Sequence, residues 1–229
     1  MGLLDFLFPK YCVNCRKLGD YLCANCFSFI SFADNSVCLV CNRGAIDSLT
    51  HPGCKGKYII NGCFSSLNYK GVVKKLIYQF KYKPYLSSLT EVLTELFYEG
   101  IIQSEQFQKA YDQKPILAPI PLHPSRFRQR GYNHAELLSL ELSKKLNLPT
   151  INLLKRTKKT IYQYGLKRDK RKENLKNAFS PSPNILISQY PNIFLVDDIL
   201  TTGSTLLEAS YVLKRNGIKN IWGLTLAKD

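Results

Sequence analysis

The stretch FLVDDILTTGST, residues 194–205, combines an apolar run, two acidic residues and a small polar turn. The apolar run Asn192–Ile199 predicts a buried strand that ends in the two acidic residues. Apolar residues at helical spacing then predict a helix over Thr205–Arg215. In an open parallel sheet, ligands bind where the strands end at their carboxyl edge. The stretch therefore predicts a strand, a ligand-binding turn and a helix in direct succession.

The polar turn suits a phosphate group. Its glycine lets the backbone approach an anion closely, and the neighbouring hydroxyl and N–H groups are hydrogen-bond donors. The helix that begins there points its positive end at the turn. The predicted phosphate-binding residues are Thr201, Thr202, Gly203, Ser204 and Thr205.

The two acids, Asp197 and Asp198, suit a different part of a ligand. Carboxylates repel phosphate, but they accept hydrogen bonds from ribose hydroxyls and bind Mg²⁺, which in turn bridges to pyrophosphate. Together with the turn, they resemble the signature of the type I phosphoribosyltransferases, which bind phosphoribosyl pyrophosphate (PRPP). That resemblance makes Asp197 and Asp198 the candidate catalytic residues.

The segments around this stretch predict the rest of the fold. Ile116–Leu122 and Ile221–Ala227 have the character of strands, and Asn133–Leu146 has helical spacing. The polar segment Ser104–Lys114 predicts a linker or loop. The alternation predicts an α/β fold with a mostly parallel sheet flanked by helices. The resemblance to the type I phosphoribosyltransferases implies that the sheet is of their kind. We expect two domains, a zinc-binding module over residues 1–63 and this α/β domain over residues 64–229.

A second anion site is predicted in the loop after Ile116–Leu122. Arg126, Arg128 and Arg130 alternate there, and guanidinium groups bind phosphate oxygens through paired hydrogen bonds. In the type I phosphoribosyltransferases the matching loop holds pyrophosphate, so the resemblance assigns Arg126 and Arg130 to a pyrophosphate group. The alternative is a solvated basic loop. His123 and His134 lie nearby and are expected to make local hydrogen bonds rather than to transfer protons.

The charge of the chain indicates a polyanionic partner. The 229 residues carry a net charge of +15, and Lys155–Lys176 alone contains ten basic and two acidic residues, with Tyr162 and Tyr164 among them. Basic side chains with aromatic neighbours suit a nucleic-acid backbone and stacked bases. The segment also suits a flap over a diphosphate, or a loop without a role. The candidate DNA contacts are Lys81, Arg126, Arg128, Lys158, Lys159 and Arg171.

All eight cysteines lie before residue 64, and six of them form C-x-x-C pairs. Two such pairs complete a tetrahedral Zn²⁺ site, and pairing in sequence order predicts two zinc ribbons. The second zinc depends on His51 acting as a ligand. Cys63 is left over and is predicted to be a core residue. The predicted ligands are Cys12, Cys15, Cys23 and Cys26 in the first ribbon, and Cys38, Cys41, His51 and Cys54 in the second.

No apolar stretch approaches the roughly 20 residues that a membrane span needs. Met1–Phe8 is apolar but lacks the basic start and cleavage site of a signal peptide. We therefore expect a cytoplasmic protein without stable membrane insertion.

The whole layout resembles the ComF family, which includes ComFC and the similar GntX proteins. Two departures from the family pattern are His51, where cysteine is usual, and His134, where glutamine is usual. The resemblance rests on motifs along the chain, namely Phe8-Pro9, the zinc pairs, Tyr69-Lys70-Gly71, Phe80-Lys81-Tyr82, Pro121–Pro124, Arg126–Asn133, Arg156-Thr157, Gln163, Leu166, Arg171, Asn174, Phe179 and Asp197–Thr205.

The resemblance implies a protein that handles incoming single-stranded DNA during natural transformation and has a PRPP-type pocket. It implies structural zinc, Mg²⁺ and PRPP as cofactors, and single-stranded DNA and competence or recombination proteins as partners. Because the last predicted strand ends near residue 229, we expect the zinc module and the region Lys70–Lys83 to cover the pocket. The alternatives are an active phosphoribosyltransferase of nucleobase salvage and a regulator that senses PRPP without turnover.

Overall fold

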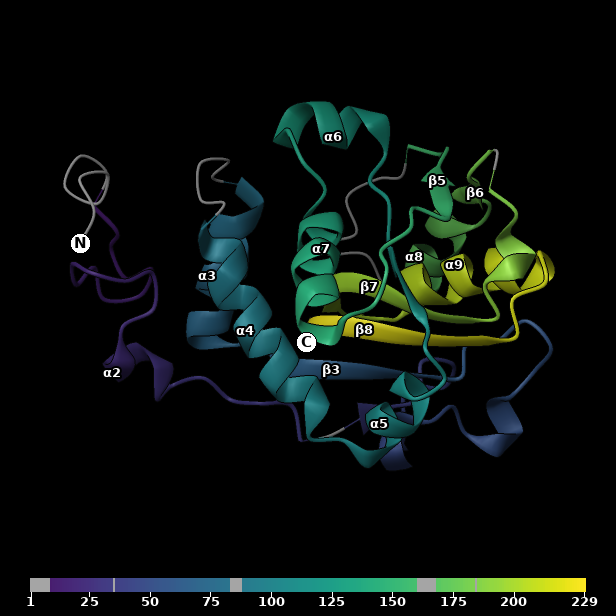
Figure 1. Ribbon diagram of the computed structural model, residues 1–229, viewed down its shortest axis with the longest axis horizontal. Helices are drawn as coiled ribbons and strands as arrows, with labels where there is room; N and C mark the ends of the chain where they lie inside the picture. Colours follow the sequence, from purple (N-terminus) through teal and green to yellow (C-terminus); the bar gives the residue numbers. More distant parts are fainter. Residues whose placement is uncertain (1–8, 35, 83–87, 160–167, 184) are drawn as a thin grey trace.

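A four-stranded sheet lies at the centre of the computed structural model, which describes residues 9–34, 36–82, 88–159, 168–183 and 185–229 (Figure 1). The strand order is β3–β8–β7–β4, and all three neighbouring pairs are parallel. These strands are Gly62–Asn68 (β3), Ile116–Pro119 (β4), Asn192–Leu200 (β7) and Asn220–Lys228 (β8). The predicted α/β fold with a mostly parallel sheet is confirmed.

Apolar residues alternate between the two faces of the sheet because successive side chains of a strand point in opposite directions. In β7, Phe194 and Val196 pack into one core and Ile193 and Leu195 into the other. Both faces of this strand are therefore buried, which explains its continuous apolar run.

Helices cover both faces (Figure 1). The face that includes Phe194, here the α7 face, is covered by Gly71–Tyr82 (α3), Ser88–Ile102 (α4), Glu105–Tyr111 (α5) and His134–Leu146 (α7). The opposite face, here the α9 face, is covered by Ser204–Arg215 (α9), Arg168–Leu175 (α8) and the antiparallel hairpin of Leu154–Arg156 (β5) and Phe179–Pro181 (β6), with a short 3₁₀ helix at Ile187–Gln189 (η3).

The prediction of a loop over Ser104–Lys114 was wrong, because α5 lies within it. The Ser104 hydroxyl caps this helix by accepting a hydrogen bond from the Phe107 N–H, and Phe107 and Ala110 are buried. Two buried residues one turn apart are enough to anchor a short helix, although the rest of the segment is polar.

Two further expectations are corrected near β4. The strand ends at Pro119, three residues earlier than predicted. The arginine segment is not a loop but a short helix, Pro124–Arg130 (α6), which begins with a proline at its first position and ends at Gly131 in a left-handed conformation. The strand β3 precedes β4 along the chain, so β4 is the second strand of the sheet in chain order.

The N-terminal region forms two small units, one packed on the α7 face and one that contacts the cores of both faces. The first ribbon, residues 9–32, contains Ala24–Phe27 (α2), which lies at the left of Figure 1, and it inserts Val13 into the core of the α7 face. The second ribbon, residues 36–54, inserts Leu39 into the core of the α9 face. It consists of the antiparallel strands Ser36–Val37 (β1) and Gly44–Ala45 (β2) and the 3₁₀ helices Ile46–Ser48 (η1) and Pro52–Cys54 (η2).

The division of the chain at residues 63 and 64 remains a prediction; β3 begins at Gly62. Cys63 is 2% exposed within this strand, so its predicted place in the core is confirmed. Over the ranges that the structure describes, no helix combines the length and apolar character that crossing a membrane requires.

Candidate functional site

The two acids of the predicted site lie near the carboxyl end of the central strand β7. Asp198 Oδ2 is 2.7 Å from Lys81 Nζ, and the two side chains are only 13% and 19% exposed. Asp197 Oδ1 accepts a hydrogen bond from the Asp198 N–H at 2.9 Å. This acid pair therefore has a cation partner from α3, a residue that the sequence suggested only as a DNA contact.

The two carboxyls differ in their proton affinity. Burial and the adjacent charge of Asp198 raise the pKa of Asp197 to about 7. Burial would also raise the pKa of Asp198, but the ammonium of Lys81 outweighs it and lowers that pKa below its ordinary value. At neutral pH, Asp198 is therefore ionised and Asp197 is poised to take up or release a proton.

The predicted phosphate-binding turn, residues 201–205 and here called the phosphate loop, follows β7 directly. Gly203 has a φ of 71° and caps the N-terminus of α9. The hydroxyls of Thr202 and Ser204 are 3.0 Å apart. The first N–H groups of a helix have no partner within the helix, so they are available to an anion here. The predicted turn into a helix is present, with the helix beginning at Ser204.

A buried histidine joins the surrounding elements. His134, at the start of α7, is 2% exposed, and burial lowers its pKa to about 4. Its ring meets the ring of Phe80 edge to face, and Arg130 Nη1 lies 3.5 Å from its Nδ1. Arg130 also lies over the ring of Tyr82, 5.2 Å from its centroid. A neutral His134 therefore packs between α3 and α7, in agreement with its predicted local role.

A second contact ties the same elements together. The hydroxyl of Tyr132 donates a hydrogen bond to the carbonyl of Phe80, the residue before Lys81. The end of α3 that carries Lys81 is thus held against the start of α7.

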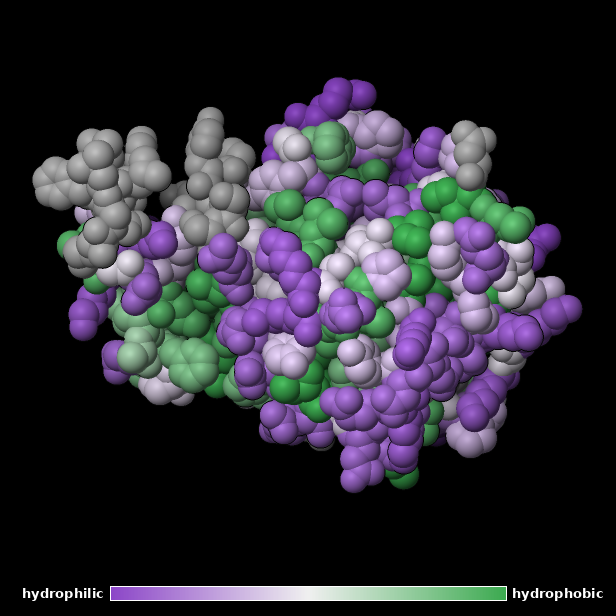
Figure 2. Space-filling model, viewed as in Figure 1, coloured by the Kyte–Doolittle hydropathy of each residue, from purple (hydrophilic) through white to green (hydrophobic). Residues whose placement is uncertain are grey.

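Cations gather around α6, which projects at the top of Figures 1 and 2 as a mostly hydrophilic surface. His123 caps this helix by accepting from the Ser125 N–H at 3.2 Å, which confirms its local role. Burial lowers the pKa of His123, and neighbouring cations lower it further. These cations, here the α6 rim, are Arg126, Arg128, Arg156 and Lys159.

Two residues of this region were not assigned to the site from the sequence. Arg156, on β5, is 7% exposed and close enough to Asp197 that the two charges perturb each other. Phe127 is 46% exposed on α6 and lies between Arg126 and Arg128 in the chain. Phe127 could have been found from the sequence, because an aromatic residue between two arginines is typical of nucleic-acid contacts. Arg156 could not, because its approach to Asp197 arises only from the fold.

The structure describes some of the remaining candidate DNA contacts and not others. Lys158 and Lys159 are exposed after β5, and Lys158 Nζ donates to the Lys176 carbonyl at 3.3 Å. Arg171 lies on α8, but its side chain is outside the described part of the structure. Tyr162 and Tyr164 are outside the described residues.

The zinc ligands come together as two groups of four. Within each group, all ligand atoms lie within 4.8 Å of one another. Four sulfur ligands at about 2.3 Å from a tetrahedral Zn²⁺ lie about 3.8 Å apart, so this spacing fits the metal. The groups are Cys12, Cys15, Cys23 and Cys26, and Cys38, Cys41, His51 and Cys54, as predicted.

The geometry at His51 fits a ligand of the second group. Its Nε2 is 2.8 Å from the carbonyl of Gly44, so this nitrogen carries the proton. Its Nδ1 lies 3.3 Å from the sulfur of Cys41, with its lone pair available to a metal. The departure from a cysteine ligand therefore preserves the second site.

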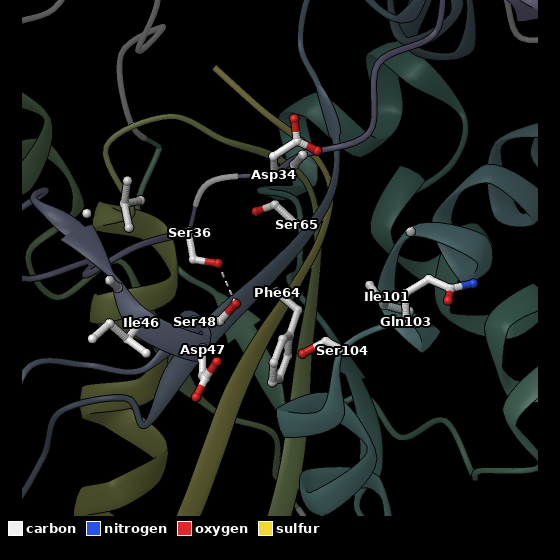
Figure 3. Close-up of a pocket in the computed structure, with 15 residues that line it drawn as sticks. Asp34, Ser36, Ile46, Asp47, Ser48, Phe64, Ser65, Ile101, Gln103 and Ser104 are labelled. Atoms are coloured by element: carbon white, nitrogen blue, oxygen red, sulfur yellow. Dashed lines mark hydrogen bonds between the residues drawn. The ribbon is translucent and has the colours of Figure 1, made fainter.

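A cavity of about 580 Å³ lies elsewhere, between the second ribbon, β3 and the junction of α4 and α5. Figure 3 shows Asp34 and Asp47 toward opposite ends, with the hydroxyls of Ser36 and Ser48 hydrogen-bonded at 2.7 Å between them. Its charged lining residues are both acidic. Because carboxylates repel phosphate, we do not assign a phosphorylated ligand to this cavity.

Comparison with known proteins agrees with this arrangement. A double zinc ribbon domain matches residues 3–55. The chain is 32% identical to Competence protein F of Haemophilus influenzae over 225 residues, covering 91% of this chain and 98% of that protein. It is 30% identical over 219 residues to the DNA utilization protein YhgH of Escherichia coli K12, covering 91% and 92%.

A more distant relative is Competence protein ComFC of Bacillus subtilis, which is 24% identical over 212 residues, covering 88% of this chain and 81% of that protein. The similarity to these proteins spans both the ribbons and the sheet. The chain belongs to the ComF family.

Proposed function

We propose that the chain binds the phosphoribosyl and pyrophosphate groups of PRPP, or of a related ligand, and handles single-stranded DNA during natural transformation. The observation that carries the proposal is the acid pair at the carboxyl end of β7, held by Lys81 and followed at once by the phosphate loop. The names of its relatives, competence and DNA utilization proteins, support the DNA-related part.

Each part of the ligand has a chemically suited partner. The phosphate loop offers hydroxyls and helix N–H groups to a terminal phosphate. Asp197 and Asp198 accept hydrogen bonds from ribose hydroxyls, and they are the residues that would hold Mg²⁺. When bound, Mg²⁺ neutralises pyrophosphate charge. Arg126 and Arg130 supply guanidinium groups for pyrophosphate, and we add Arg156, whose charge already acts on Asp197.

The exposed side of α6 and the segment after β5 supply the contact surface for DNA. Arg128 and Phe127 are exposed side by side in the sequence, and Lys158 and Lys159 follow β5. Basic side chains track phosphates, and an exposed aromatic ring stacks on any base. This surface suits a single strand without sequence preference.

Calorimetry with PRPP and Mg²⁺ tests the first part of the proposal. Wild type is expected to bind, and Asp197→Ala and Asp198→Ala are expected to lose binding. Asp112→Ala, which removes an exposed acid next to α5, is the matched control and should bind normally. Absence of binding by wild type would overturn this part.

A pyrophosphate-release assay with single-stranded DNA then separates the alternatives. Release that depends on Asp197 indicates a phosphoribosyltransferase, whereas a gain in thermal stability without release indicates a PRPP sensor.

Mobility shifts test the DNA contact. Phe127→Ala should weaken single-strand binding by about 1–3 kcal/mol. The control is Leu140→Ala on α7, since Leu140 and Phe127 are both 46% exposed. Binding should also fall steeply with salt. Equal binding by both variants and by wild type would remove Phe127 from the contact.

A further inference from the structure

Leu39 of the second ribbon packs against the phosphate loop at Gly203. This residue lies between the zinc ligands Cys38 and Cys41 and is 2% exposed. A Cβ atom added to Gly203 would lie 3.0 Å from Leu39 Cδ2, 3.2 Å from its Cβ and 3.4 Å from its Cγ. The glycine is therefore needed for its positive φ and also for the space that Leu39 occupies.

The position of Leu39 is set by the fold of the zinc knuckle. The Cys38 N–H donates to the Arg43 carbonyl at 3.0 Å, and the Asn42 N–H donates to the Cys38 carbonyl at 2.7 Å. Leu39 stands inside this turn and is flanked on both sides by ligands of the second metal group. A metal that fixes the ligands also fixes the side chain between them.

A separate aromatic contact holds a different part of α9. Tyr58, just after the ribbon, meets Tyr211 of α9 edge to face with ring centroids 5.6 Å apart. Tyr211 lies two turns into the helix, so this contact holds the body of α9. Leu39 is the residue that reaches its N-terminal cap, Gly203.

We propose that Leu39 is a positioning residue of the phosphate loop, through which the second zinc ribbon and phosphate binding are coupled. The proposal rests on the proposed function for its ligand, the phosphate end of a phosphoribosyl group. Zinc holds the knuckle, the knuckle holds Leu39, and Leu39 packs on the loop at the residue where the backbone must face an anion. By linkage, a ligand that orders the loop must equally strengthen retention of the second zinc.

Hydrogen exchange tests the contact without any ligand. Leu39→Ala should speed exchange of the backbone amides of residues 202–207 several-fold, because packing against the cap is lost. The control is Ile46→Ala, a change in the same ribbon at a residue that is 82% exposed. Both variants should keep two zinc ions per chain by elemental analysis, which shows that the knuckle still folds. Equal exchange in the two variants would overturn the proposal.

Zinc release to a colorimetric chelator tests the coupling. With PRPP and Mg²⁺ present, wild type and Ile46→Ala should release one of their two zinc ions more slowly, and Leu39→Ala should lose that protection. Leu39→Ala should also bind PRPP on the order of tenfold more weakly. Unchanged release in wild type at saturating PRPP would overturn the coupling.

A double-mutant cycle gives the sharpest measurement. Gly203→Ala alone meets Leu39 and adopts an unfavourable φ, whereas in the Leu39→Ala background only the unfavourable φ and a closer Cβ contact remain. The loss of stability on changing Gly203 should therefore be smaller in that background. Additive losses would exclude the contact. If wild type binds no PRPP, the proposed function fails, while hydrogen exchange and this cycle still decide the role of Leu39.

Discussion

The two zinc ribbons are alike in sequence and differ in how they attach to the sheet: the first packs on the α7 face, whereas the second contacts both faces, with Leu49 against the core of the α7 face. The first packs Val13 into the core of the α7 face, and Tyr21, Leu22 and Ile30 pack against the same core. The second packs Leu39 into the core of the α9 face. Metal knuckles of one kind thus brace both sides of one sheet, and neither ribbon is a separate appendage.

The two faces carry different parts of the candidate site. The first ribbon contacts α3, since Lys75 Nζ donates to Asn14 Oδ1 at 2.9 Å, and the last turn of α3 carries Lys81, the partner of Asp198. The second ribbon contacts the phosphate loop through Leu39. We infer that loss of zinc from the first ribbon affects Lys81 and its pair with Asp198, here the cation side of the site. Loss of zinc from the second ribbon affects the phosphate loop, here the phosphate side.

Removing one ligand from each ribbon should have the largest effects. Cys15→Ser and Cys54→Ser are each expected to reduce the zinc content from two ions to one and to lower the free energy of unfolding by more than about 3 kcal/mol. Hydrogen exchange should then separate them, with faster exchange in the phosphate loop only for Cys54→Ser. Elemental analysis and thermal unfolding provide the other readouts.

The control for zinc content is Cys63→Ala, which removes a buried cysteine that belongs to neither metal group. It should retain both zinc ions. Equal loosening of the phosphate loop in the two ligand variants would contradict the division between the ribbons.

Lys81→Ala tests the cation side directly. It leaves the Asp198 carboxylate poorly exposed and without its ammonium partner, so we expect a loss of about 2 kcal/mol of stability and a higher pKa for Asp198. Denaturant unfolding measures the loss, and NMR titration of the carboxyl measures the pKa. The control is Lys144→Ala, which breaks an exposed pair with Glu141 and should cost little.

The outcome against this prediction is an equal loss in the two lysine variants. Such a result would mean that Lys81 behaves as an ordinary surface charge, which would still be compatible with a DNA contact. It would also mean that Lys81 does not stabilise the Asp198 carboxylate in the candidate site.

A smaller, pH-dependent effect is expected at Asp197, on the strand between the two faces. Its pKa is 3.8 ordinarily and about 7 in the folded protein. The folded state therefore binds the proton more tightly, so the stability from this carboxyl is fully present below pH 3.8 and is lost as pH rises through 7. The free energy of unfolding of Asp197→Asn, relative to that of wild type, should therefore increase by at least about 1 kcal/mol as the pH rises from about 5 to about 8.

Urea unfolding across this pH range measures the difference, with Asp112→Asn as the exposed control. A stability difference that stays constant with pH would show that Asp197 is ionised throughout.

Much of this arrangement was predictable because its signals are local. The strand and turn over residues 194–205 are predicted by a run of apolar residues followed by acids, glycine and hydroxyl-bearing residues. The zinc ligands follow from spacing alone, and even His51 was correctly placed. Such patterns depend on neighbours within a few residues, which a sequence displays directly.

The contacts that shape the site join distant residues, and these were not predictable. Lys81 and Asp198 are 117 positions apart, and Leu39 and Gly203 are 164 apart. Periodicity reports which face of an element is buried but not which element covers it. The helix α5 was missed for a different reason, because its cap at Ser104 and its two buried residues give too short a pattern within a polar segment.

The smallest predicted effect concerns the contact between the first ribbon and α3. Lys75→Ala removes an exposed hydrogen bond to Asn14, whose amide also donates to the sulfur of Cys26 at 3.3 Å. Since that second bond remains, stability should fall by no more than about 0.5 kcal/mol. Zinc release from the first ribbon should be slightly faster than in Lys74→Ala, which removes an exposed lysine one position earlier. A large loss of stability in Lys75→Ala alone would mean that the first ribbon depends on this single polar contact. A small loss means that the ribbon is attached mainly by the apolar packing of Val13 in the core of the α7 face.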